Sequence, residues 1–326
     1  MIYTVTLNPS IDYVIKVKEL VKGHINRVNE EHVYPGGKGI NVTRILKNLD
    51  NDNIALGFVS GFTGDYIINS LKELGLKSNF IKVEQGFTRI NVKIKSEEET
   101  EINGQGPNIK KEELDEFYKV IDQLVDGDIL ILSGSIPSCL DEKLYEDIMK
   151  RVEHKNIKVV VDATKNLLLN VLKYKPFLIK PNNHELAEMF NVELNTTQDI
   201  IFYAEKLKEM GAQNVLISMG KDGALLVSED NQVLISSVAK GEVVNSVGAG
   251  DSMVAGFISG YLKSQNYEDA LRLGAASGGA TAFSSDLATR EFIDKLVKEI
   301  KIEKIKCTKC TKKEENNINN AQKIWG

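Results

Sequence analysis

Short apolar runs alternate with segments of helical periodicity along most of the chain. Runs at 54–60, 129–132, 158–161, 177–179 and 215–218 are typical of buried strands. Between them apolar residues recur every three or four positions, and this pattern is clearest at Leu114, Phe117, Tyr118, Ile121 and Leu124. Helices are also expected at 65–74, before Gly75, and at 141–152. Strands separated by helices predict right-handed βαβ units, and therefore a mostly parallel sheet with helices on both faces.

Two segments, 12–18 and 88–102, alternate like strands but have no helix directly after them. In the second segment Arg89, Asn91 and Lys93 share one face, and apolar residues share the other. We expect these segments to form a small antiparallel sheet attached to the main α/β body. Such a sheet would serve as a lid over a cleft or as a dimer surface.

Composition narrows the class of protein. The formal net charge is -5, so no basic excess favours nucleic-acid binding. The first residues lack the charged and apolar regions of a signal peptide, and no apolar run reaches the roughly 18 residues that would span a membrane. Three cysteines cannot form a disulfide framework, and their usage suits the cytoplasm.

The sharpest local motif is Gly248-Ala249-Gly250-Asp251, which precedes a helical run at 253–262. Glycines let the backbone approach a ligand, and the unpaired N–H groups of a helix's first turn favour an anion such as a transferring phosphoryl group. A carboxylate beside that anion would serve as a base rather than as a phosphate ligand. The alternative is that Gly250 is a turn glycine and Asp251 an N-cap.

A second glycine cluster opens a helix and includes Gly36, Gly37, Lys38 and Asn41. These residues could contact a polar substrate closely, although a plain strand–helix turn has the same composition. Asp12 follows the first strand and could accept hydrogen bonds from substrate hydroxyl groups. An Asx-turn is the alternative interpretation of Asp12.

Polar residues also follow two strand ends, where ligands gather in parallel sheets. They are Lys180, Asn182, Glu185, Ser218, Gly220 and Gly223. Lys180 could approach phosphate, and Glu185 could hold the water shell of a metal–nucleotide complex. Helix capping by Asn182 or Asn183 explains the first group equally well, and a hairpin turn explains the second.

The order and spacing of these motifs resemble the ribokinase-like (PfkB) carbohydrate kinases, in their phosphosugar branch. The resemblance covers roughly residues 1–300 and includes Thr6–Asp12, Gly36–Asn41 and Gly248–Asp251. Residues 85–93 and 100–104 look like those of 1-phosphofructokinases, and tagatose-6-phosphate kinases are the next most similar group. The resemblance implies a three-layer α/β/α fold with a β lid formed by residues 12–35 and 86–105. It gives a kinase domain at 1–305 and a disordered tail at 306–326, where we assign no function to Cys307 and Cys310.

The implied activity is ATP-dependent phosphorylation of fructose 1-phosphate at its 6-hydroxyl. Alternatives are tagatose 6-phosphate or fructose 6-phosphate as the substrate, or a non-catalytic sugar-phosphate-binding regulator. By resemblance Asp251 is the general base in the loop formed with Gly248, Ala249 and Gly250. The backbone N–H groups of Ala249, Gly250 and Asp251 are expected to form the anion hole. The phosphosugar is expected at Asp12, Gly36, Gly37, Lys38, Asn41, Arg89, Lys93 and Ser133.

ATP is expected at Lys180, Asn182, Ser218, Gly220 and Gly223, with Mg²⁺ held through water by Glu185. K⁺ is a further candidate cofactor near 245–247, where Asn245-Ser246 stand in place of the family's frequent Asp-Thr. The resemblance also implies a homodimer formed through the β lid.

Overall fold

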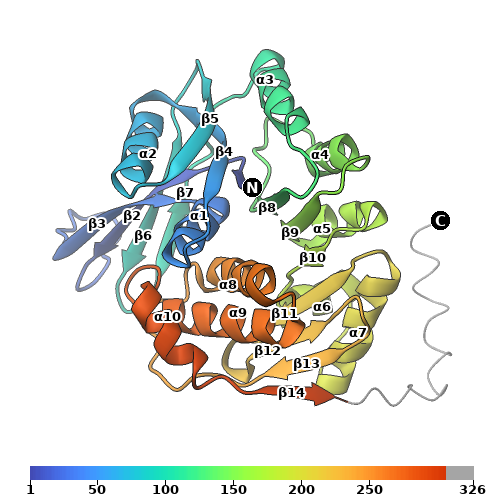
Figure 1. The fold of residues 1–326 in the computed structure, drawn as a ribbon. Helices are drawn as coiled ribbons and strands as arrows, with labels where there is room; N and C mark the ends of the chain where they lie inside the picture. The colour runs from blue at the N-terminus through green and yellow to red at the C-terminus, as the bar shows by residue number, and fades with distance from the viewer. Residues whose placement is uncertain (306–326) are drawn as a thin grey trace.

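The computed structural model describes residues 1–305 and contains two sheets (Figure 1). The larger has ten strands in the order β14-β13-β12-β11-β10-β9-β8-β1-β4-β5. Its strands are β1 (Ile2–Thr6), β4 (Asn53–Ser60), β5 (Lys77–Val83), β8 (Ile129–Ser133), β9 (Lys158–Asp162), β10 (Leu178–Ile179), β11 (Asn214–Ser218), β12 (Ala224–Val227), β13 (Val233–Ser236) and β14 (Ile302–Ile305). The neighbours from β5 to β11 are parallel, and β12 to β14 continue the sheet in antiparallel pairs.

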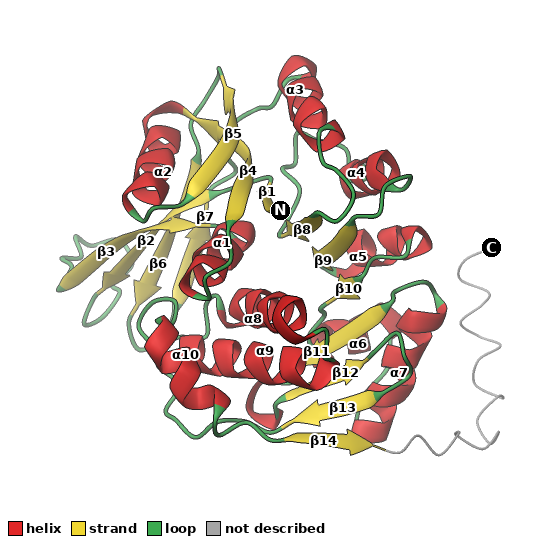
Figure 2. Ribbon diagram, in the orientation of Figure 1, coloured by secondary structure: helices red, strands yellow, loops and turns green. Residues whose placement is uncertain are grey.

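Helices cover both faces of this sheet, which confirms the predicted three-layer α/β/α architecture (Figure 2). One layer consists of α1 (Lys38–Asn48), α2 (Gly61–Glu73), α8 (Ala249–Ser264), α9 (Tyr267–Ala282) and α10 (Arg290–Val297). The other consists of α3 (Lys111–Asp122), α4 (Leu144–Val152), α5 (Lys165–Val171), α6 (Asn183–Phe190) and α7 (Thr197–Glu209). Short 3₁₀ helices occur at Leu172–Tyr174 and Gly220–Asp222.

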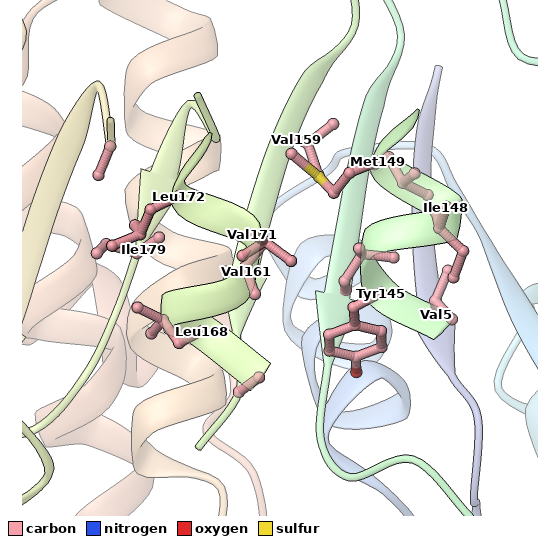
Figure 3. Close-up of a cluster of buried hydrophobic side chains, with 14 of the residues drawn as sticks. Val5, Tyr145, Ile148, Met149, Val159, Val161, Leu168, Val171, Leu172 and Ile179 are labelled. Carbon is pink, nitrogen blue, oxygen red and sulfur yellow. The ribbon is translucent and has the colours of Figure 1, made fainter. Parts of the chain in front are cut away.

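The apolar strand runs supply side chains to both layers. In β9, Val159 and Val161 pack in the cluster beneath α4 and α5, whereas Val160 packs on the opposite face. Tyr145 of α4 and Leu168 of α5 belong to the first cluster (Figure 3). Because both faces of the central strands are covered, their sequence is a continuous apolar run rather than an alternating one.

The smaller sheet has the order β3-β2-β6-β7 and lies at one side of the main body (Figure 1). Its strands are β2 (Ser10–Lys16), β3 (Glu30–Gly36), β6 (Arg89–Lys95) and β7 (Thr100–Asn103). We call this four-stranded sheet the β lid. The expected antiparallel pairing is wrong at the centre, where β2 and β6 are parallel. The two strands follow β1 and β5, which run in the same direction in the large sheet, so both enter the lid with the same orientation.

Several element boundaries differ from the predictions. Helix α2 begins at Gly61, four residues earlier than expected, because its first turn is Gly-Phe-Thr-Gly and carries little helical signal. Helix α4 begins at Leu144 rather than 141. The alternating segment 88–102 is two strands, since a turn at 96–99 separates β6 from β7.

Within residues 1–305, no helix is long and apolar enough to cross a membrane. The CxxC pair formed by Cys307 and Cys310, together with the predicted tail, lies outside the described residues.

Candidate active site

A cleft of about 400 Å³ lies between the carboxyl ends of the parallel strands and the β lid. Its lining residues come from the lid, from the amino ends of α1 and α8, and from the ends of β9, β10 and β11. They are Ser10, Asp12, Gly37, Lys38, Asn41, Arg89, Asn91, Lys93, Asp162, Lys180, Asn182, Glu185, Ser218, Val247, Gly248, Gly250 and Asp251. The structure therefore brings together most of the residues singled out in the sequence. Gly36, Ser133, Ala249, Gly220 and Gly223 do not line this cleft.

Helix α8 presents its amino end to the cleft. Its N-cap is Gly248, in the left-handed region at φ 80°, so Asp251 is the third helical residue and the N-cap alternative is wrong. The amide of Ala249 donates to the carbonyl of Ser246 at 3.2 Å. Among the described residues, the amides of Gly250 and Asp251 donate to no backbone carbonyl. These two N–H groups are therefore the donors that the helix offers to an anion, and that of Ala249 is already engaged.

Asp251 is buried and held by Asn41 of α1. The Asn41 side-chain amide donates to Asp251 Oδ2 at 2.8 Å. Burial and the nearby charge of Asp162 raise the pKa of Asp251 to about 6, although Lys38, Asn41 and Lys180 oppose the rise. A carboxylate with a pKa of about 6 is ionised at neutral pH and is a better proton acceptor than an ordinary aspartate.

The floor of the cleft contains a buried carboxylate that was not singled out in the sequence. Asp162 is the last residue of β9 and is 1% exposed. Its Oδ1 lies 3.5 Å from Lys38 Nζ and 3.4 Å from Lys180 Nζ. The two ammonium groups hold the pKa of Asp162 below its usual value, although burial alone would raise it. The available signal was an acidic residue directly after the apolar run 158–161, at the carboxyl end of a parallel strand.

On the lid side, Asp12 is the centre of a polar cluster. Its Oδ1 accepts hydrogen bonds from Ser10 Oγ at 2.7 Å and from Asn91 Nδ2 at 3.2 Å. Its Oδ2 lies 3.2 Å from Lys93 Nζ, and that ammonium group is 3.9 Å from Glu101. Both carboxylate oxygens of Asp12 therefore have side-chain partners within the lid. These contacts are not those of an Asx-turn, in which the carboxylate accepts from a nearby backbone amide.

Arg89 lies at the start of β6, two residues from Asn91 on the same face. Its Nε donates to the carbonyl of Asn8 at 3.1 Å, which orients the guanidinium group in the cleft. Partial burial lowers the pKa of Arg89, and Asp12 opposes this effect. The remaining N–H groups of a guanidinium can form the bidentate contacts that phosphate favours.

Gly36 and Gly37 are close to the lid cluster and to β1. A Cβ added at Gly36 would lie 2.5 Å from the carboxyl carbon of Asp12. Gly37 has φ 124°, and a Cβ there would lie 2.6 Å from Thr6 Cγ2. Glycine is therefore required at both positions for the turn between β3 and α1 to pack against Asp12 and β1.

Asn182 and Glu185 form a capping box on α6. Asn182 Oδ1 accepts from the Glu185 amide at 2.8 Å, and Glu185 Oε2 accepts from the Asn182 amide at 2.8 Å. The capping alternative is therefore confirmed for Asn182. Both residues also line the cleft, and one carboxylate oxygen of Glu185 is not used in the box.

The hairpin alternative is also confirmed for residues 218–223. Strands β11 and β12 are antiparallel and are joined through the short 3₁₀ helix at Gly220–Asp222. Ser218 forms a parallel bridge with Asn182 and lines the cleft. Gly223 has φ 89°, and a Cβ there would lie 2.2 Å from the carbonyl oxygen of Ser236. This glycine is explained by packing at the turn.

The chemistry of the cleft fits a nucleotide with a divalent cation. Two amides at the amino end of α8 and the ammonium group of Lys180 are suited to phosphate oxygens. The second carboxylate oxygen of Asp162 is buried and has no hydrogen-bond partner among the described residues. That oxygen is not exposed to the cleft. Glu185 lines the cleft and has one carboxylate oxygen that the capping box does not use, and carboxylate oxygens are the donors that Mg²⁺ prefers.

Comparisons with known proteins agree with this geometry. The chain matches the pfkB family of carbohydrate kinases over residues 5–292. It is 49% identical to the 1-phosphofructokinase of Bacillus subtilis over 93% of this chain and 99% of that protein. It is 38% identical to the D-tagatose-1-phosphate kinase of Bacillus licheniformis over 93% and 99% of the two chains.

Solved structures of phosphofructokinase-2 from Escherichia coli include complexes with fructose-6-phosphate and with potassium, and a tetrameric inhibited form. They share 26% sequence identity with this chain over 91% of its length and 98% of theirs, with TM-scores of 0.84, 0.85 and 0.84. The family match covers most of the chain and includes the lid, the glycine cluster and the amino end of α8. The chain belongs to the pfkB family of carbohydrate kinases.

Proposed function

We propose that the protein transfers the γ-phosphoryl group of ATP to the 6-hydroxyl of fructose 1-phosphate. The observation that carries this proposal is the buried Asp251 beside the unpaired amides of α8, in a cleft that the β lid faces. An anion site with an adjacent base is suited to phosphoryl transfer to an alcohol. The name of the Bacillus subtilis relative supports fructose 1-phosphate as the acceptor.

In this mechanism Asp251 accepts the proton of the 6-hydroxyl as that oxygen attacks the γ-phosphorus. A new oxygen–phosphorus bond forms, and the bond to the bridging oxygen of ADP breaks with its electron pair leaving on ADP. Asn41 holds Oδ2 of the base, so the other carboxylate oxygen is available to the hydroxyl group. Closure of the lid would exclude water, which competes with the sugar as an acceptor.

Charge on the transferred group is expected to be stabilised from two sides. The amides of Gly250 and Asp251 lie at the positive end of α8, and Lys38 and Lys180 supply full positive charges. When bound, Mg²⁺ supplies further neutralisation of the phosphate oxygens. We expect Glu185 to hold it through water with the oxygen that the capping box leaves available.

The phosphosugar is expected to lie against the lid. Arg89 is the better placed of the two predicted phosphate ligands. Within residues 1–305 only its Nε is engaged, whereas Lys93 is already paired with Asp12 and Glu101. Ser133 lies next to Asp162 in the floor, and its buried hydroxyl has no partner in the described structure. Because Ser133 does not line the cleft, we do not count it among the contacts to the phosphosugar.

A parallel assay of phosphosugars tests this assignment. Fructose 1-phosphate should give the highest kcat/KM, compared with fructose 6-phosphate and tagatose 6-phosphate. The Bacillus licheniformis relative makes D-tagatose 1-phosphate a second candidate, so it belongs in the same panel. A preference for either 6-phosphate would overturn the assignment. Absence of ATP turnover with all four sugars would instead indicate the non-catalytic regulator.

We further propose a homodimer formed through the back of the β lid. Val33, Tyr13, Val92 and Ile102 are register partners and form one apolar row across all four strands, on the side away from Asp12. Val33 and Ile102 are exposed, at 43% and 60%. An exposed apolar sheet face is typical of an association surface. Sedimentation should give about twice the chain mass of 36.2 kDa.

K⁺ is proposed as an activating cation near residues 245–247. Support comes from the solved potassium complex of the Escherichia coli relative. In this chain the Asn245 side chain bridges two loops, since its Nδ2 donates to the Ser285 carbonyl at 3.3 Å and its Oδ1 accepts from the Val247 amide at 3.1 Å. Turnover should be higher in KCl than in choline chloride at equal ionic strength, and equal turnover would remove K⁺ from the mechanism.

A further inference from the structure

The side chain of Asp162 pairs with two lysines and with no backbone group in the described structure. An aspartate at a strand end commonly caps the next turn through backbone amides. Here Thr164 is the N-cap of α5, and the only side-chain partners of Asp162 within the described chain are Lys38 and Lys180, both at Oδ1. The carboxylate therefore does not cap the turn that follows β9.

The two lysines come from opposite sides of the cleft. Lys38 is the first residue of α1 and follows the glycine cluster beside the lid. Lys180 follows β10 and lies against the amino end of α8, since a Cβ added at Gly250 would be 3.1 Å from its Nζ. Two ammonium groups that lie close together repel each other. The buried carboxylate of Asp162 lies between them and offsets that repulsion.

We propose that Asp162 is a positioning residue that clamps Lys38 and Lys180 together, so that both ammonium groups face the phosphoryl group in transfer. This inference deepens the proposed function and rests on it for the identity of the anion. The clamp itself is a property of the free protein, because it involves only the chain's own charges. It can therefore be measured without any substrate.

Two electrostatic effects follow from the same geometry. Asp162 raises the pKa of Lys38, whose side chain is 40% exposed and can react with reagents in solution. Asp162 also raises the pKa of Asp251, while Lys38 and Lys180 lower it. Replacement by asparagine keeps the shape and removes the charge. It should lower the pKa of both Lys38 and Asp251.

Amine labelling of Asp162→Asn, followed by mass spectrometry, tests the clamp directly. At pH 8–9 the neutral fraction of Lys38 should increase, so its labelling rate should rise several-fold over wild type. Lys82, which pairs with the exposed Asp65, is an internal control and should not change. An unchanged Lys38 rate would overturn the proposal, whether or not the protein proves to be a fructose 1-phosphate kinase.

Kinetics of the same variant add a readout that a merely structural residue would not move. The kcat for phosphoryl transfer should fall about 10- to 100-fold, and the acid limb of the kcat–pH profile should move to lower pH. If the variant only lost stability, the active fraction would fall at every pH and the acid limb of the kcat–pH profile would not move. An acid limb that does not move would also contradict the clamp.

Lys180→Gln provides a reciprocal test if the buried asparagine variant does not fold. With Lys180 neutralised, Asp162 pairs with Lys38 alone, so Lys38 should be labelled more slowly than in wild type. The acid limb should move to higher pH, because Lys180 no longer lowers the pKa of Asp251. Faster labelling of Lys38, or a limb that moves to lower pH, would exclude a shared clamp.

Discussion

At the scale of single residues, the proposed chemistry depends on how Asp251 is surrounded. Burial raises its pKa and makes it a stronger base, while Asn41 and Lys38 keep it ionised at neutral pH. An exposed aspartate would be ionised but weakly basic. A buried aspartate without such partners would be protonated and unable to accept a proton.

Asp251→Asn should abolish most of the turnover, because asparagine keeps the shape and accepts the Asn41 hydrogen bond but cannot take a proton. We expect kcat to fall on the order of 10²-fold or more, with the KM for ATP nearly unchanged. Steady-state kinetics with fructose 1-phosphate measure this. Asp122→Asn, which removes an exposed partner of Arg151, is the matched control and should retain full activity.

The stability of the same variant has a definite pH dependence. Because the folded-state pKa of Asp251 is raised, its contribution to folding is complete below the unfolded pKa near 4 and is lost as pH rises through about 6. The Asp251→Asn variant lacks this loss. Between pH 4 and pH 8 its free energy of unfolding should therefore increase, relative to that of wild type, by on the order of 3 kcal/mol. Denaturant unfolding at both pH values measures the difference. A constant difference would show that the pKa is not raised.

The wild-type kcat/KM for the phosphosugar should rise with pH through a midpoint near 6, since only the ionised form of Asp251 is a base. Asn41→Leu removes a hydrogen bond that lowers this pKa, so the midpoint should move to higher pH. Profiles measured at phosphosugar concentrations well below KM report the free enzyme and provide the comparison. A midpoint that stays in place would mean that another group controls the acid limb.

At the scale of elements, the amino end of α8 combines a tight turn with an open donor site. Gly248 takes the left-handed conformation, and Gly250 leaves room for Lys180, whose Nζ would lie 3.1 Å from a Cβ added there. These glycines serve different purposes, since the first meets a backbone requirement and the second allows the Lys180 ammonium group to lie against the amino end of the helix.

Gly250→Ala should therefore separate activity from stability. Alanine favours a helix by up to about 1 kcal/mol over glycine, and the nearest atom to its Cβ is the flexible end of Lys180. We expect an unchanged or higher Tm together with a kcat at least about 10-fold lower, because the methyl group displaces the Lys180 ammonium group that lies beside the unpaired amides. Gly279→Ala in α9, where the nearest atom is 3.9 Å away, should change neither kcat nor KM. Full activity of Gly250→Ala would remove this amide from the site.

Elements with a strong apolar pattern could be predicted from the sequence, because the burial of apolar side chains is what determines where they form. Strand β8 is buried on both faces and reads as a continuous apolar run, whereas helix α3 buries one face and shows helical periodicity. The start of α2 was missed because its first turn is stabilised by packing rather than by propensity. Asp162 was missed because its significance comes from Lys38 and Lys180, which are distant in sequence and meet it only in the fold.

At the scale of the whole molecule, the β lid has two faces with different composition. Asp12, Asn91 and Lys93 face the cleft, and the row through Tyr13 and Ile102 faces away from it. Period-two alternation along each strand produces both faces at once, so the proposed substrate contacts and the proposed association surface come from alternate residues of the same strands. Association through the back face would hold the lid in place without closing the cleft.

Ile102→Glu should convert the proposed dimer to a monomer, because a carboxylate buried in an apolar contact loses its hydration. Sedimentation velocity should show the mass falling from about twice 36.2 kDa to that of one chain. Val125→Glu is the matched control, since Val125 is 62% exposed, similar to 60% for Ile102, and lies between α3 and β8 rather than on the lid. It should leave the mass unchanged. Dissociation by Val125→Glu, or a dimer that survives Ile102→Glu, would place the association surface elsewhere.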